Sequence, residues 1–172
     1  MKTEINKKIN IVIFGNGMFV SGRNTNGFGT VMPAILEFQK QTKKINKVFI
    51  IGTNHKHSFE ANSKINKLTK SMGIKVPVYF YPSKKSKKNQ FNFKNLSFKY
   101  PTCAIVSVPD HLHYKITLKC LKKKLHTLVV KPLTLKTSES KKLSRVAKKN
   151  NLLGIVEFHK RLDKQNLINK NL

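Results

Sequence analysis

Short apolar runs alternate along the chain with longer stretches in which apolar residues recur at helical spacing. Each run is four to six residues long and most are bounded by glycine, proline or asparagine, as expected for strands that are buried on both faces of a parallel sheet. The predicted strands are residues 9–14, 47–52, 76–81, 103–108, 125–130 and 154–158.

The stretches between these runs predict amphipathic helices. Helices are expected over residues 31–44, 60–72 and 136–149, with another after Asp110 that carries Leu112 and Leu121 on one face. Thr30 and Asp110 are predicted N-caps, and Gly73 is a predicted helix stop. Strands and helices that alternate at this spacing predict right-handed crossovers and a parallel sheet. The expected fold is therefore an α/β single domain with a doubly wound, six-stranded parallel sheet and a truncated C-terminal extension.

Composition adds a strong positive charge. The 172 residues include 35 Lys and Arg, only three of them Arg, against seven Asp and Glu, for a net charge of +28. The lysines recur through every predicted helix and loop, whereas specific recognition of phosphates and bases favours Arg. We interpret the charge as a compositional bias with non-specific attraction to polyanions. A Lys-rich polyanion or nucleic-acid binder stays open as an alternative.

Cysteine usage and hydropathy predict a cytoplasmic, soluble protein. Cys103 and Cys120 lie in an apolar run and in a helical stretch, outside any C-x-x-C motif, so we expect two buried or semi-buried free thiols. No apolar run approaches the roughly 18 residues that a membrane span needs. Residues 1–8 are polar and do not have the pattern of a secretory signal.

Two further patterns have ordinary structural explanations. A Lys- and Ser-rich stretch over residues 83–90 is expected to be a solvated loop, and the apolar residues that follow are expected to cover the core rather than to stack on bases. Paired histidines occur twice without a compact carboxylate or thiol cluster, so no metal site is expected. The residues concerned are Phe91, Phe93, Leu96 and Phe98, and His55, His57, His111 and His113.

The first predicted strand ends at Gly15-Asn16-Gly17, which we call the glycine turn. Gly15 can adopt the backbone angles of a tight turn, and Gly17 lacks a Cβ and lets the backbone approach a pyrophosphate. The third glycine of a G-x-G-x-x-G pattern is absent, because Val20 stands at that position. The turn indicates either a nucleotide site or a plain strand-to-loop connection.

Ligands of open parallel sheets bind outside the carboxyl ends of the strands. Several polar or conformationally special segments are predicted to follow strands and therefore to gather at that edge. They are Gly15 and Gly17, Thr53 to Lys56, Pro109 to His113, Lys131-Pro132, and His159 to Arg161.

Four motifs in order resemble the Gfo/Idh/MocA oxidoreductases. They are the glycine turn, Val-Pro-Asp-His-Leu-His at 108–113, Val-Val-Lys-Pro-Leu at 129–133, and Glu-Phe-His-Lys-Arg-Leu-Asp at 157–163. The resemblance implies a Rossmann domain over residues 1–158 that binds NAD or NADP. It also implies hydride exchange with a sugar- or cyclitol-like alcohol, and a second α/β domain for the substrate, of which residues 159–172 would be the start.

The same resemblance implies roles for individual residues. Lys131 stands at the lysine of the family's Glu-Lys-Pro motif and would touch both the ribose and the reacting hydroxyl, which makes it the candidate catalytic residue. An ammonium group there can stabilise a developing alkoxide and pass on a proton. The other implied cofactor-binding residues are Gly15, Gly17, Met18, Pro109, His113 and Pro132.

Two departures from the family pattern concern the cofactor. Val130 replaces the usual glutamate of the Glu-Lys-Pro motif, which removes a carboxylate that could orient Lys131. No Asp or Glu occurs between Phe38 and Phe59, so the usual carboxylate for the ribose 2′-hydroxyl is absent. Thr53, Asn54 and Lys56 suit a 2′-phosphate, which favours NADP modestly over NAD.

A further departure is the length of the chain, which stops where the substrate domain should begin. We expect a chain that binds dinucleotide by itself and turns over a sugar-like substrate only with the missing domain. A complementing chain or a second copy is a possible partner, and no membrane partner is expected. A non-catalytic interaction module on a Rossmann scaffold stays open as an alternative.

Overall fold

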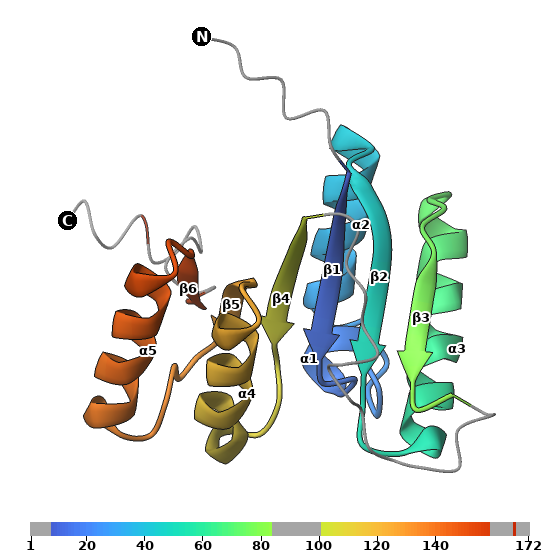
Figure 1. Ribbon diagram of the computed structural model, residues 1–172. Coiled ribbons are helices and arrows are strands. Elements are labelled where there is room, and N and C mark those ends of the chain that lie inside the picture. The colour runs from blue at the N-terminus through green and yellow to red at the C-terminus, as the bar shows by residue number, and fades with distance from the viewer. Residues whose placement is uncertain (1–7, 84–100, 159–166, 168–172) are drawn as a thin grey trace, which may run out of the picture. The chain divides into compact units, whose positions relative to one another are not determined.

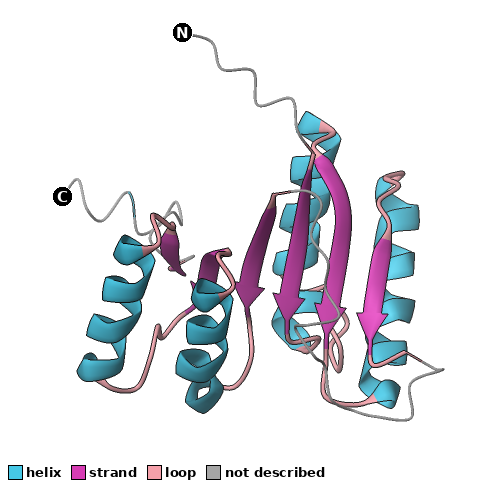
Figure 2. Ribbon diagram, in the orientation of Figure 1, coloured by secondary structure: helices cyan, strands magenta, loops and turns pink. Residues whose placement is uncertain are grey.

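The computed structural model describes residues 8–83, 101–158 and 167. These residues form six strands and five helices (Figures 1 and 2). In chain order they are β1 (Ile9–Phe14), α1 (Met18–Ser21), α2 (Val31–Thr42), β2 (Ile45–Ile51), α3 (His55–Met72), β3 (Val78–Tyr81), β4 (Thr102–Val106), α4 (Asp110–Lys122), β5 (His126–Val130), α5 (Thr137–Lys149) and β6 (Gly154–Glu157).

The strands follow the order β3-β2-β1-β4-β5-β6 of a six-stranded sheet. The pairs β1 with β2, β1 with β4, β2 with β3 and β5 with β6 are all parallel. This order is that of the doubly wound nucleotide-binding fold, so the predicted fold class is confirmed. The chain divides into two compact units, Met1–Val108 and Pro109–Leu172, and we describe each by itself.

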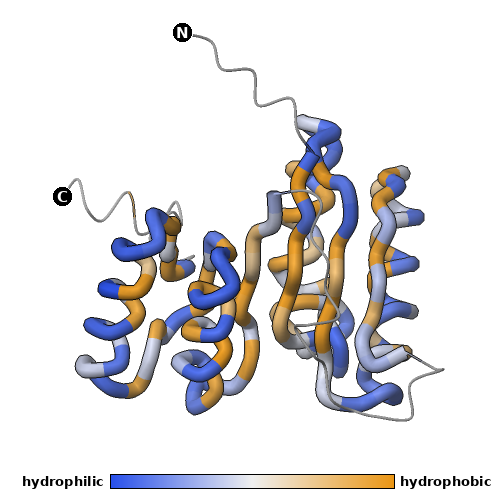
Figure 3. The backbone as a smooth tube through the Cα atoms, in the orientation of Figure 1, coloured by the Kyte–Doolittle hydropathy of each residue, from blue (hydrophilic) through white to orange (hydrophobic). Residues whose placement is uncertain are grey.

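In the first unit β1 is central, with β2 on one side and β4 on the other. The amides of Gly15 and Gly52 continue the ladder beyond the strands, since they donate to the carbonyls of Ile51 and Tyr81. Helices α2 and α3 lie on one face of the strands (Figure 1). Ile13, Leu36 and other apolar side chains of these elements form the main core, and β1 is apolar along most of its length (Figure 3).

In the second unit α4 packs against both α5 and β5. A smaller core forms from the buried residues Leu121, Leu143 and Ala147. The side of Gly154 that would carry a Cβ faces Ala147 of α5, at ordinary van der Waals distance. Lys131 and Pro132 follow directly after β5, at its carboxyl end.

Several predicted boundaries shift by one or two residues, and three larger differences concern how helices begin. Helix α3 begins at His55 rather than at residue 60, because the Asn54 side chain accepts a hydrogen bond from the His57 amide and caps the helix earlier. Pro109, not Asp110, is the N-cap of α4, and Asp110 is the first helical residue. The single-turn helix α1, Met18–Ser21, has no counterpart among the predicted elements because four residues carry no periodic signal.

The two thiols lie as predicted. Cys103 is half-buried and Cys120 is buried, and both are free. Among the helices that the structure describes, none is both long and apolar enough to cross a bilayer. All of the predicted 83–90 loop after Ser83, the apolar residues Phe91 to Phe98, and the segment His159 to Arg161 lie outside the described residues.

Candidate functional site

The first glycine of the glycine turn is required by the fold. Gly15 has a φ of +110°, which side chains rarely allow, and a Cβ on it would overlap the backbone carbonyl of Ser107. The turn therefore passes directly against the end of β4, and the sharp exit of the chain from β1 depends on the missing side chain.

The second glycine has no such structural reason. Gly17 has a φ of −80°, and a Cβ on it would meet nothing within 4 Å. It is the N-cap of α1, and its carbonyl accepts hydrogen bonds from the amides of Val20 and Ser21. Amides at a helix start have no partner within the helix, and Met18 beside them is half-exposed. The space above Gly17 is thus open to a ligand that must approach the backbone.

Helix α3 fixes the loop that follows α1, residues 22–29, which we call the glycine loop. The Lys64 ammonium donates to the carbonyls of Thr25 at 2.6 Å and Gly27 at 3.1 Å. It also lies 5.7 Å from the centre of the Phe28 ring. Arg23 pairs with Glu60 of α3 at 3.5 Å. A polar loop that the sequence left without structure is therefore anchored at both ends.

A polar network joins the glycine turn to the start of α3. The buried Asn16 donates from Nδ2 to Ser58 Oγ at 3.5 Å. The Ser58 hydroxyl contacts the carbonyls of Asn54 at 3.1 Å and Tyr81 at 3.3 Å. Since Asn16 follows β1, Asn54 follows β2 and Tyr81 ends β3, the network ties together the carboxyl ends of three strands.

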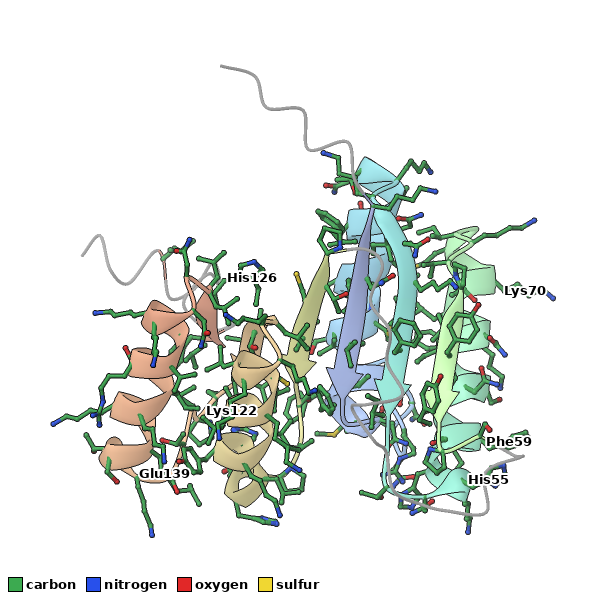
Figure 4. The ribbon with its side chains drawn as sticks, viewed as in Figure 1. His55, Phe59, Lys70, Lys122, His126 and Glu139 are labelled. Atoms are coloured by element: carbon green, nitrogen blue, oxygen red, sulfur yellow. The ribbon has the colours of Figure 1, made fainter. Side chains whose placement is uncertain are left out.

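The start of α3 carries the residues predicted to meet a 2′-phosphate. Thr53 and Lys56 are exposed, and the first turn of α3 contains no acidic residue. Asn54 is engaged in capping, because its Oδ1 accepts from the His57 amide at 2.8 Å and its Nδ2 lies 2.9 Å from His57 Nδ1. His55 and Phe59 mark this end of the helix, toward which β2 and β3 point, and Lys70 lies near the opposite end (Figure 4).

In the second unit a buried histidine holds the turn after β5. His113, on α4, is fully buried, and its Nδ1 makes a short hydrogen bond with the carbonyl oxygen of Pro132. Since the carbonyl can only accept, Nδ1 carries the proton. Lys131 is exposed at the end of β5, and Pro109 is exposed at the start of α4. His113 and Pro132 are thus brought together, and the ring fixes the backbone next to Lys131.

Three positions of this site escaped prediction from the sequence. Asn16 and Ser58 are small polar residues whose burial shows only in the structure, and Lys64 is one of many lysines. For Asn16 the one available signal was a polar residue between two glycines. Within the described part of the chain, no group of three or more His, Cys, Asp or Glu could hold a metal ion.

The fold and the glycine turn define a nucleotide-binding domain of the Rossmann class. Residues 9–158 match the model of the oxidoreductase family with an NAD-binding Rossmann fold, Gfo/Idh/MocA, and the chain belongs to this family. The resemblance predicted from four motifs is confirmed. No match was found among curated protein sequences.

Solved structures of oxidoreductases share the fold. An NAD-binding oxidoreductase from Klebsiella pneumoniae has a TM-score of 0.59 at 13% identity, with 95% of this chain and 38% of that chain covered. A 3-ketoreductase from Actinomadura kijaniata, in complex with TDP-benzene and NADP, has a TM-score of 0.61 at 20% identity, with 96% and 43% covered. A UDP-N-acetylglucosamine 3-dehydrogenase from Acidithiobacillus ferrooxidans has 0.55 at 15%, with 94% and 41% covered. The chain therefore spans about two fifths of the length of these proteins.

Proposed function

We propose that this chain binds NADP(H) in preference to NAD(H), as the nucleotide-binding part of an oxidoreductase that acts on a sugar-like alcohol. The observation that carries the proposal is Gly17, where the fold tolerates a side chain and open space lies above the backbone. A pyrophosphate needs this close approach, and the amides at the start of α1 provide hydrogen-bond donors for it.

The preference for NADP rests on the charges around the start of α3. Lys56 and Thr53 are exposed there without an acidic neighbour in the first turn. A 2′-phosphate gains from an ammonium and a hydroxyl, whereas the 2′-hydroxyl of NAD gains most from a carboxylate. Asn54 contributes through its cap of α3, which fixes where Lys56 stands, because both polar atoms of its side chain contact His57.

Lys131 is the proposed catalytic residue. The bound cofactor supplies the hydride acceptor, and oxidation of the alcohol leaves a proton and a developing negative oxygen. The Lys131 ammonium is suited to stabilise that oxygen and to pass the proton on. His113 would act on Lys131 through the Pro132 carbonyl that it holds, and we place Pro109, His113 and Pro132 beside the cofactor by resemblance to the family.

We assign residues 1–158 to the cofactor domain and residues 159–172 to the start of a substrate domain. Similarity to a 3-ketoreductase and to a UDP-N-acetylglucosamine 3-dehydrogenase supports a substrate that carries a sugar hydroxyl or ketone. Positioning of the carbinol carbon requires a pocket, so we expect turnover only with a substrate domain, supplied by a complementing chain or a second copy.

The test is a calorimetric titration of the chain with NADPH and with NADH at moderate salt, which suppresses non-specific charge attraction. Saturable binding of NADPH, weakened in Lys56→Ala but not in Lys67→Ala on the same helix, supports the proposal. Equal affinity for the two cofactors removes the NADP preference. Binding of heparin without binding of either cofactor would instead favour the polyanion alternative.

A further inference from the structure

Gly52 is the residue that follows β2. The space where its side chain would lie is filled by the side chain of another residue. A Cβ on Gly52 would overlap the side-chain amide of Asn16, with Nδ2 the nearest atom. The φ angle of Gly52 is not left-handed, so the backbone conformation by itself does not require glycine there. A side chain at position 52 is disfavoured by space alone, because Asn16 takes that space and would have to shift.

Burial and one long hydrogen bond place Asn16 in this position. Its side chain is buried, with 6% of the residue exposed, and Nδ2 donates to Ser58 Oγ. The same hydroxyl donates to the Asn54 and Tyr81 carbonyls, so the Asn16 amide contacts a side chain that is itself fixed at the start of α3. A side chain at position 52 and the amide of residue 16 therefore exclude each other.

This exclusion bears on the choice of cofactor. Dinucleotide-binding folds select the 2′-hydroxyl of NAD with a carboxylate near the end of the second strand. Here the volume beside the backbone at that strand end is occupied by a neutral amide, which adds no negative charge close to Thr53 and Lys56. A carboxylate in the same volume would repel a 2′-phosphate.

We propose that Asn16 is a specificity-determining residue, which favours NADP(H) by filling with a neutral amide the volume that an acidic side chain at position 52 would need. The inference rests on the proposed function, because it concerns the same dinucleotide site. The glycine turn is proposed to approach the pyrophosphate. With Asn16, one of its residues would also help to discriminate between the 2′-hydroxyl and the 2′-phosphate.

The steric part is tested by a double-mutant cycle. Gly52→Ala is expected to lower the thermal unfolding midpoint, and the Asn16→Ala/Gly52→Ala double variant is expected to recover most of that loss relative to Asn16→Ala. Additive effects of the two substitutions would overturn the exclusion of one side chain by the other.

The specificity part is tested by titration of NADPH and NADH into Asn16→Asp, an isosteric change, with Asn66→Asp on the exposed side of α3 as the charge-matched control. The ratio of NADPH to NADH affinity is expected to fall at least tenfold in Asn16→Asp and to stay unchanged in Asn66→Asp. If Asn16→Asp does not fold, Asn16→Ala/Gly52→Asp places the carboxylate in the same volume and carries the same expectation.

The outcomes separate this inference from the proposed function. Wild-type chain that binds neither cofactor overturns both. Wild-type chain that binds NADPH, with an unchanged affinity ratio in the folded acidic variants, overturns the role of Asn16 and leaves the proposed function standing.

Discussion

Gly15 lies against Ser107 so closely that no side chain fits between them. The Cβ of any other residue at position 15 would overlap the Ser107 carbonyl, and the φ of +110° adds conformational strain. Gly15 and Ser107 meet through their backbones at the ends of the paired strands β1 and β4. Neither backbone can therefore move away without loss of the hydrogen bonds between these strands. Gly15 is thus a structural glycine.

Gly15→Ala is therefore expected to lower the free energy of unfolding by about 2–4 kcal/mol. Urea denaturation monitored by circular dichroism measures the loss. Gly27→Ala is the matched control, because a Cβ there meets only the Thr25 hydroxyl, at 3.9 Å, and φ is not left-handed. Equal stability of the two variants would contradict the structural role of Gly15.

Gly17→Ala is expected to behave in the opposite way. Its free energy of unfolding should stay within about 0.5 kcal/mol of wild type, because the added methyl group enters open space. NADPH affinity should fall about tenfold or more, since the methyl group lies where the pyrophosphate must approach. Titration of Gly17→Ala and Gly27→Ala side by side gives the comparison, and unchanged affinity would place the pyrophosphate elsewhere.

Lys64→Met should release the glycine loop while keeping most of the side-chain volume. The variant loses the hydrogen bonds to the Thr25 and Gly27 carbonyls, with an expected cost of about 1–3 kcal/mol. Hydrogen exchange followed by mass spectrometry should show faster exchange over residues 22–29. Lys67→Met, exposed on the same helix, should leave that exchange unchanged.

Substitutions of His113 separate its hydrogen bond from its volume. His113→Phe fills the space but leaves the Pro132 carbonyl without its donor, so about 1–3 kcal/mol of stability should be lost. His113→Asn places an amide donor near the position of Nδ1 and should retain part of the hydrogen bond. Faster exchange at the amides of residues 131, 133 and 134 in the Phe variant than in the Asn variant is the expected signature. The reverse order would show that volume matters more than the hydrogen bond.

Cys120 should make stability depend on pH in the alkaline range. Burial raises the pKa of the Cys120 thiol from 9.0 to about 12. The folded state therefore keeps its proton where the unfolded chain loses it. The contribution of the protonated Cys120 thiol to the stability of the fold is complete below pH 9 and is lost between pH 9 and about 12. By pH 10 the free energy of unfolding should have fallen by about 1 kcal/mol.

Denaturation of wild type and Cys120→Ala at pH 8 and pH 10 measures this contribution of the Cys120 thiol to stability, because the lysines affect both chains alike. The difference in free energy of unfolding between the two chains should shrink as pH rises. A constant difference would show that the thiol loses its proton at the same pH in the folded and unfolded states. Folded Cys120 should also resist alkylation more strongly than half-buried Cys103, whose pKa burial also raises.

Local patterns of apolar and polar residues predicted most of the strands and helices. Short apolar runs marked the strands, the first two of them ending at glycine, and helical spacing marked α2, α4 and α5, because burial on both faces of a parallel sheet and on one face of a helix leaves different periodicities. The start of α3 was misplaced because residues 55–59 have no apolar period, and the Asn54 cap that begins the helix depends on a hydrogen bond across three residues.

By itself the sequence determined the alternation of strands and helices, the glycine turn and the four motifs by which the family is identified. The tertiary structure decided which glycine the fold needs, since the close approach of Gly15 to Ser107 joins residues 92 positions apart. It also decided that Asn16 fills the space beside Gly52 and that His113 holds Pro132. Such contacts depend on how separate strands and helices come together, and no local pattern of polar and apolar residues records them.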